Sequence, residues 1–127
     1  MLLPPAAHAG EVKDSEFIRA APDNWSFEGA ETHARFIPFG SNLVLSSKED
    51  LNLFGPQYSP ERFEKILAAC ASLRINLLKV FLPIGQVLPD LQAPGEVHIA
   101  PGYFDHLADF LTLCRKHDIR AVVALTE

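Results

Sequence analysis

The sequence has few cysteines and no concentrated positive charge. Among its 127 residues only Cys70 and Cys114 are cysteines, which is too few for the disulfide scaffold of a small secreted domain. The 11 Lys and Arg residues are scattered singly and are outnumbered by 16 Asp and Glu residues. Nucleic-acid binding requires a concentrated positive field. The sequence therefore argues against a disulfide scaffold and against a nucleic-acid partner.

Long apolar runs and familiar catalytic motifs are also absent. No apolar run approaches the roughly 20 residues that a membrane-spanning helix needs, so we expect no membrane span. The sequence contains no H-E-x-x-H, C-x-x-C, Walker A or G-x-S-x-G motif, and its five histidines are too widely spaced to form a metal-ligand pair. We therefore expect neither a metal site nor a cofactor.

The composition is that of an ordinary folded domain. Hydrophobic residues make up 48% and charged residues 21% of the chain, and a chain of this length can bury a sizeable core. Residues 1–16 show little periodicity. Their "AHA" before Gly10 resembles a signal-peptidase site, but no basic region or apolar core of useful length precedes it. We expect a flexible tail or a leader remnant over 1–16 and the folded part over 17–127.

The first predicted elements are strands. Residues 17–20 and 25–29 are expected to form a short β-hairpin, because the turn formers Pro, Asp and Asn occupy 22–24. The apolar segment 34–45 predicts a buried strand, in which Gly40 permits a bend or a close approach of the backbone. A polar loop is expected after it.

Two amphipathic helices and two further strands follow. Ser59 is a suitable N-cap and Pro60 a suitable first helical residue; the apolar stripe of this helix is Phe63, Ile66, Leu67, Cys70 and Leu73. The stripe of the second helix is Phe104, Leu107, Leu111 and Cys114. Both cysteines are therefore expected to be buried free thiols. Segments 75–84 and 119–126 are almost continuously apolar, which predicts strands covered on both faces.

Strands that alternate with helices predict a parallel sheet built from right-handed βαβ units. Both an open doubly wound sheet and a (β/α)₈ barrel fit this order. The long connections 46–58 and 85–101 follow strands, whereas the returns from helix to strand are short, as in barrel enzymes. No G-x-G-x-x-G motif is present. We therefore favour an α/β fold that is a partial TIM barrel, with three strands and two helices after a short β-hairpin.

Several stretches resemble one enzyme group. They are "FIRAAPDNWSFEGAETHARFIPFGSN", "SPERFEKILAACASLRINLLKVFLP" and the final "IRAVVALTE". Their order is similar to the N-terminal part of clan A glycoside hydrolases of the cellulase and β-mannanase type, over about residues 17–127. In that group a short hairpin closes the barrel floor and a G-x-N sequence lies near the first strand, which here is Gly40-Ser41-Asn42.

The resemblance implies retaining hydrolysis of O-glycosidic bonds in a β-linked polysaccharide or oligosaccharide, and an extracellular or periplasmic location. The family's two catalytic glutamates end strands four and seven, with carboxyl groups roughly 5 Å apart. Because this sequence stops before both, we expect an inactive fragment with no catalytic residue of its own. Open strand edges would then favour self-association. The alternative is a complete small α/β domain that binds a partner or ligand without catalysis.

Two candidate sugar-binding residues come from the strands. Asn42 matches the position at which the first barrel strand delivers a side chain to the sugar; an Asx-turn that ends the strand is the alternative. Lys79 stands where the family commonly has an arginine that braces the active-site carboxylate. Lysine keeps the charge but loses the bidentate fork. Its alternative is an ammonium group that reaches the rim of the sheet.

The remaining candidates are expected in loops and at the last strand. Tyr58, with Phe54, lies in the first long loop after a strand, and His98 lies in the second, where sugar contacts are expected in a barrel. Trp25 is expected to pack in the hairpin core. Glu127 follows the third strand and is predicted to bind substrate or to support a binding residue; a frayed terminal residue is the alternative.

Overall fold

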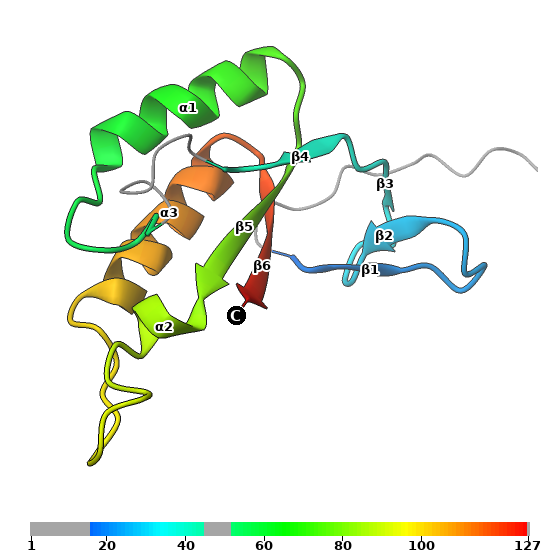
Figure 1. Cartoon of the computed structure of the whole chain (residues 1–127). Coiled ribbons are helices and arrows are strands. Elements are labelled where there is room, and N and C mark those ends of the chain that lie inside the picture. The colour runs from blue at the N-terminus through cyan, green and yellow to red at the C-terminus, as the bar shows by residue number, and fades with distance from the viewer. Residues whose placement is uncertain (1–15, 45–51, 127) are drawn as a thin grey trace, which may run out of the picture. The chain divides into compact units, whose positions relative to one another are not determined.

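The computed structural model describes residues 16–44 and 52–126, which divide into two compact units between Pro38 and Phe39 (Figure 1). The fold is mixed α/β, with two small sheets and three helices in the described residues and no closed barrel among them. Most of the predicted lead-in lies outside the described residues. Glu16 is the exception: it is buried, and its carboxylate accepts hydrogen bonds from the Glu31 and Thr32 N–H groups and from the Thr32 hydroxyl.

The first unit is an antiparallel sheet whose strands run in the order β1 (Ile18–Ala20), β2 (Phe27–Gly29) and β3 (Arg35–Phe36). The predicted hairpin is confirmed by the pairing of β1 with β2. Its turn is closed by Asp23, whose Oδ1 accepts hydrogen bonds from the N–H groups of Trp25 and Ser26 at 2.8 and 2.9 Å. These bonds, the Trp25 one above all, lower the pKa of Asp23.

The prediction of one buried strand over 34–45 is wrong. Part of it pairs antiparallel with β2 as β3, and part forms β4 (Gly40–Asn42) in the other sheet. Pro38 separates them, and a proline cannot donate to a strand ladder. All three residues of β4 are exposed. Position 45 lies outside the described residues.

The second unit is built on a parallel sheet. Its strand order is β4, β5 (Leu77–Pro83) and β6 (Arg120–Thr126), with Gly40, Leu77 and Arg120 in register. Helix α1 (Pro60–Ser72) connects β4 to β5, and α3 (Tyr103–Lys116) lies between β5 and β6 along the chain. The predicted β-α-β-α-β order is therefore confirmed. The connection predicted as a loop over 85–101 begins with the single turn α2 (Ile84–Val87).

Helix α1 begins where its sequence indicates. The Ser59 hydroxyl accepts a hydrogen bond from the Arg62 N–H at 3.2 Å, and Pro60 occupies the first turn. Phe63 and Leu67 from the predicted stripe are buried, and Ile66 and Cys70 are partly buried. Leu73 is the exception: it follows the last helical residue and is 67% exposed.

The buried face of α3 differs from the predicted stripe. Its buried residues are Tyr103, Leu107, Phe110 and Cys114. Phe104 and Leu111 are 47% and 39% exposed. The predicted stripe and the observed buried face both have helical spacing, and both contain Leu107 and Cys114, so periodicity alone does not distinguish them. The larger rings of Tyr103 and Phe110 pack into the core because they contact Phe54, at ring-centroid distances of 5.9 and 5.4 Å.

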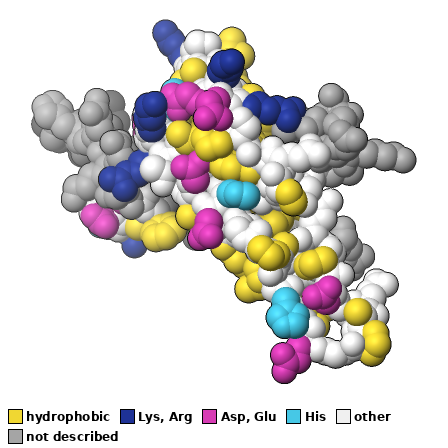
Figure 2. Space-filling model, turned by 90° about the vertical axis from the view of Figure 1, so that its left-hand side faces the viewer, with side chains coloured by type: hydrophobic (Ala, Val, Ile, Leu, Met, Phe, Trp, Pro, Cys, Tyr) yellow, Lys and Arg dark blue, Asp and Glu magenta, His cyan; other side chains and the backbone are white. Residues whose placement is uncertain are grey.

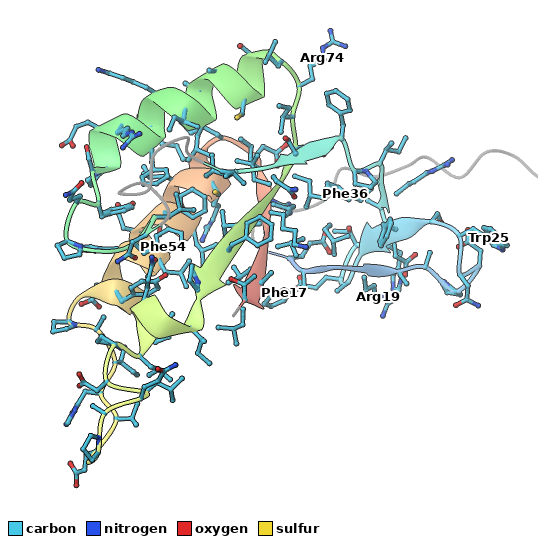
Figure 3. All side chains as sticks on the ribbon, viewed as in Figure 1. Phe17, Arg19, Trp25, Phe36, Phe54 and Arg74 are labelled. Carbon is cyan, nitrogen blue, oxygen red and sulfur yellow. The ribbon has the colours of Figure 1, made fainter. Side chains whose placement is uncertain are left out.

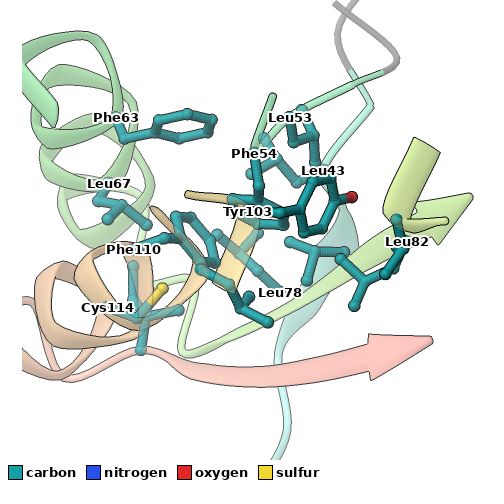
Figure 4. Close-up of a cluster of buried hydrophobic side chains, with 14 residues drawn as sticks. Leu43, Leu53, Phe54, Phe63, Leu67, Leu78, Leu82, Tyr103, Phe110 and Cys114 are labelled. Atoms are coloured by element: carbon teal, nitrogen blue, oxygen red, sulfur yellow. The ribbon is translucent and has the colours of Figure 1, made fainter. Parts of the chain in front are cut away.

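One hydrophobic core lies between the helices and one face of the parallel sheet. Figure 4 shows Phe63 and Leu67 from α1 and Phe110 and Cys114 from α3 near Leu78 of β5. The full core cluster is Leu43, Leu53, Phe54, Phe63, Leu67, Leu78, Val80, Leu82, Val87, Tyr103, Leu107, Phe110, Cys114 and Ile119. Cys114 is buried and Cys70 partly buried, and both are free thiols, as predicted.

The prediction that segments 75–84 and 119–126 form strands covered on both faces is wrong for the described residues, because β5 and β6 both have exposed side chains. In β5 the side chains of Leu78, Val80 and Leu82 are buried, whereas Lys79 between them is exposed. In β6, Val122, Val123 and Leu125 are 45%, 41% and 70% exposed. An apolar run alone does not reveal whether a second layer covers it.

Candidate functional site

The two strand-borne candidates, Asn42 and Lys79, are neighbours in the sheet. Asn42 of β4 pairs with Lys79 of β5, which in turn pairs with Val122 of β6. Residues in register on parallel strands point to the same face, and Lys79 alternates with the buried Leu78 and Val80. Asn42, Lys79 and Val122 therefore lie on the face away from the core. We call this surface, together with Phe81, the open sheet face.

Among the described residues in register here, which are Asn42, Lys79 and Val122, only Lys79 is a cation. Its Nζ lies 5.1 Å from the centroid of the Phe81 ring, a cation–π contact that stabilises an exposed pair by about 0.5–1 kcal/mol. No ion pair of Lys79 is found within the described residues. Both Lys79 and Asn42 are exposed. Their ammonium and amide groups are free to donate hydrogen bonds to hydroxyl or carboxylate oxygens.

Tyr58 takes part in a different arrangement. Its ring stacks on His106 with centroids 4.8 Å apart and planes 15° apart. Its hydroxyl donates to Asp109 Oδ2 at 2.6 Å. Burial, followed by the bond to Asp109, raises the pKa of Tyr58. Tyr58 thus connects the loop before α1 to α3, and its hydroxyl hydrogen is used in the bond to Asp109.

The neighbour of Tyr58, Phe54, is not available for stacking on a sugar. Its side chain is fully buried, and Figure 3 shows it between the helices and the sheet. The carbonyl oxygen of Phe54 lies 2.9 Å from His106 Nδ1. Because a carbonyl only accepts, Nδ1 of His106 is the donor in this hydrogen bond.

The sequence did not predict the group formed by Tyr58, His106 and Asp109. The spacing of His106 and Asp109 on one helix is a visible signal, because residues three apart lie on the same face of a helix. The contact with a residue 51 positions away is not visible in the sequence. The described contacts of this group are internal, so its arrangement stabilises the fold.

His98 and Glu127 are not brought to the open sheet face by any described contact. His98 lies in the exposed connection before α3, with Nδ1 3.4 Å from Asp90 Oδ2 and Nε2 3.9 Å from Glu96 Oε2. Glu127 lies outside the described residues. Among the residues described, no group of three or more His, Cys, Asp or Glu is placed to hold a metal ion.

The prediction for Trp25 is wrong. It was expected in the hairpin core, but its side chain is 93% exposed. Figure 3 shows it at the end of the turn between β1 and β2. The turn residues Asp23 and Ser26 bond to each other and leave the indole ring outside the sheet.

Charged side chains form short mixed clusters. Glu64 of α1 accepts hydrogen bonds from Lys116 at 2.7 Å and from His117 at 3.0 Å, and Lys116 above all lowers the pKa of Glu64. In the first unit, Glu28 bonds to Arg19 and His33. On the face seen in Figure 2, Lys and Arg side chains are interspersed with Asp and Glu.

No described helix is long and apolar enough to cross a membrane. Comparison with family models, with curated proteins and with solved structures finds no match to this chain.

Proposed function

We propose that this chain is a segment of a glycoside hydrolase-type (β/α)₈ barrel whose open sheet face contributes sugar-binding side chains. Asn42 and Lys79 are the residues that would contact the sugar or a catalytic carboxylate. The single observation that carries the proposal is their pairing in register on the sheet face opposite to the one that α1 and α3, the two long helices of the described residues, cover. The wider resemblance of residues 17–127 to clan A glycoside hydrolases points to the same chemistry.

The order of the strands supports a barrel segment. Strands β4, β5 and β6 lie side by side in chain order, so the sheet has no reversal of strand order within the described residues. The two long helices pack on each other and on one sheet face, because α1 and α3 residues share a core with β5. A doubly wound sheet would place helices on both faces. A barrel keeps them outside and directs the other face inward.

The role proposed for the open sheet face is binding. Retaining hydrolysis requires two carboxyl groups roughly 5 Å apart. The side chains assigned to the open sheet face are an amide, an ammonium group, an aromatic ring and a valine, without a carboxylate among them. Binding is therefore the property that can be tested on this chain.

The test is a titration of the ¹⁵N-labelled chain with cello- and manno-oligosaccharides, followed by amide chemical shifts. We expect shifts in β4 and β5 around Asn42 and Lys79, and their loss in Asn42→Ala and Lys79→Met. Lys65→Met is the matched control, because Lys65 is an exposed lysine on α1. The purified chain should not hydrolyse chromogenic β-glucan or β-mannan. Turnover, or shifts that are equally lost in the Lys65 variant, would overturn the proposal.

A second candidate is a complete small α/β domain that binds a partner without catalysis. The observation in its favour is the single core of the second unit, in which fourteen residues are buried together. Such a domain would unfold cooperatively and would remain unaffected by sugars. Sharp, two-state unfolding of a monomer with no response to any oligosaccharide would favour this candidate over the barrel segment.

A further inference from the structure

The outer edge of β6 carries backbone groups that no described strand pairs with. Strand β5 pairs with one side of β6, and β6 ends the strand order among residues 16–44 and 52–126. The Arg120 N–H donates to Asn76 O at 2.8 Å, on the β5 side. Backbone groups alternate in direction along a strand. Those of Ala121, Val123 and Leu125 therefore face away from β5.

This edge lacks the features that protect natural sheet edges. Such edges usually contain charged residues, proline or a bulge. The stretch from Ala121 to Thr126 contains neither charge nor proline, and all of its residues pair regularly with β5. Val123 and Leu125 are 41% and 70% exposed, although Val80 and Leu82 beside them in β5 are almost fully buried. The outer edge of β6 therefore has exposed apolar side chains next to backbone groups that no described strand pairs with.

The other edge of the same sheet is a poorer partner. Strand β4 has only three residues, and Pro38 precedes it closely. A head-to-tail array of copies would have to pair β6 with this short strand. A two-fold axis instead pairs β6 with itself in the antiparallel direction, over a longer stretch, and closes the assembly at two copies. Because residues 121–126 are uncharged, no like charges face each other within that stretch.

We propose that β6 forms an antiparallel pair with β6 of a second copy of this chain. The two parallel sheets then become one continuous sheet, in which Ala121, Val123 and Leu125 supply the hydrogen-bonding groups between copies. Val123 and Leu125 bury apolar surface against their counterparts. This pairing uses the edge of β6, whereas the proposed sugar-binding role uses the open sheet face; a further barrel strand beside β6 would occupy the same edge, so the pair is proposed for the chain of residues 1–127.

The experiment measures the mass of the chain by sedimentation over a wide range of concentration. We expect a monomer–dimer equilibrium for the unaltered chain. Val123→Pro removes an outward N–H that the pairing with β5 does not use, and should leave a monomer with unchanged circular dichroism. Leu125→Lys adds charge to the edge without removing a backbone donor, and tests the same contact if the proline variant fails to fold.

Two further variants locate the contact. Leu73→Lys alters an apolar residue at the end of α1 that is 67% exposed, close to the 70% of Leu125, and should leave the dimer intact. Val122→Lys changes the open sheet face while its N–H points toward β5, and should weaken the dimer less than Val123→Pro. The proposal is overturned by a monomer at every concentration, by open-ended polymers, or by a dimer that persists in folded Val123→Pro and Leu125→Lys.

Discussion

Tyr58 and Asp109 are joined by a hydrogen bond of 2.6 Å although they lie 51 positions apart. Tyr58 directly precedes the N-cap of α1, and Asp109 lies within α3. The bond therefore attaches the start of one helix to the side of the other. Tyr103, also on α3, presents the opposite case: its side chain is 1% exposed, and its hydroxyl has no hydrogen-bond partner in the described structure.

Removing the Tyr58 hydroxyl should destabilise the protein. Tyr58→Phe keeps the ring stacked on His106 but leaves the Asp109 carboxylate without its donor. A hydrogen bond to a charged group contributes about 1.5–3 kcal/mol, and the lower end applies because Tyr58 is only partly buried. Urea unfolding followed by circular dichroism measures the loss. An unchanged free energy of unfolding would contradict the structural role assigned to this bond.

Removing the hydroxyl of Tyr103 should have the opposite effect on the free energy of unfolding. Tyr103→Phe removes a hydroxyl that is buried without a partner, and desolvating such a group costs about 1–3 kcal/mol. The variant should therefore be at least as stable as the unaltered chain. The pair of Tyr→Phe variants controls for the loss of a hydroxyl in general. Equal destabilisation at both positions would show that the hydroxyl of Tyr103 is satisfied in solution.

The contribution of Tyr58 should depend on pH in the alkaline range. Its pKa is raised above the ordinary value of 10.0 in the folded chain, so the unfolded chain loses this proton first. The stabilisation is fully present below pH 10 and is lost as the pH rises above that value. The difference in free energy of unfolding between the unaltered chain and Tyr58→Phe should therefore shrink above pH 10. A difference that stays constant would contradict the raised pKa.

Gly40 should not tolerate a side chain. A Cβ at this position would collide with the Leu77 backbone oxygen and lie 2.8 Å from Leu77 Cβ, on the neighbouring strand. Overpacking of this kind costs about 1–3 kcal/mol, so Gly40→Ala should lower the thermal midpoint. Gly85→Ala is the matched control, because a Cβ there meets nothing within 4 Å. Equal midpoints for the two variants would refute the close approach of β4 to β5.

Trp25 offers a direct check of the first unit. It is the only tryptophan of the chain and is 93% exposed, so its fluorescence should resemble that of free indole in water. Acrylamide should quench it almost as strongly in the folded chain as in urea. A blue-shifted emission that is protected from acrylamide would show that Trp25 is covered in solution.

Local signals in the sequence predicted the parts of the fold that depend on neighbouring residues. Ser59 and Pro60 mark the start of α1 because both act through the first turn itself. The turn at Asp23 and the close approach at Gly40 likewise depend on residue types with few alternatives. Three misplaced features, which are the uncovered face of β5, the exposed Trp25 and the buried face of α3, all depend on contacts between residues far apart in the sequence.

The sequence by itself determined the first hairpin, the limits of the two long helices and the strands beside them, and the polar side chains at Asn42 and Lys79, but not the division of 34–45 into β3 and β4. Periodicity and capping are local properties, because they depend on residues only a few positions apart in the sequence. Only the tertiary structure decided that Asn42 and Lys79 are neighbours, that Tyr58 is held by Asp109, and that one face of β5 is open. Strand pairing and burial depend on contacts between residues far apart in the chain.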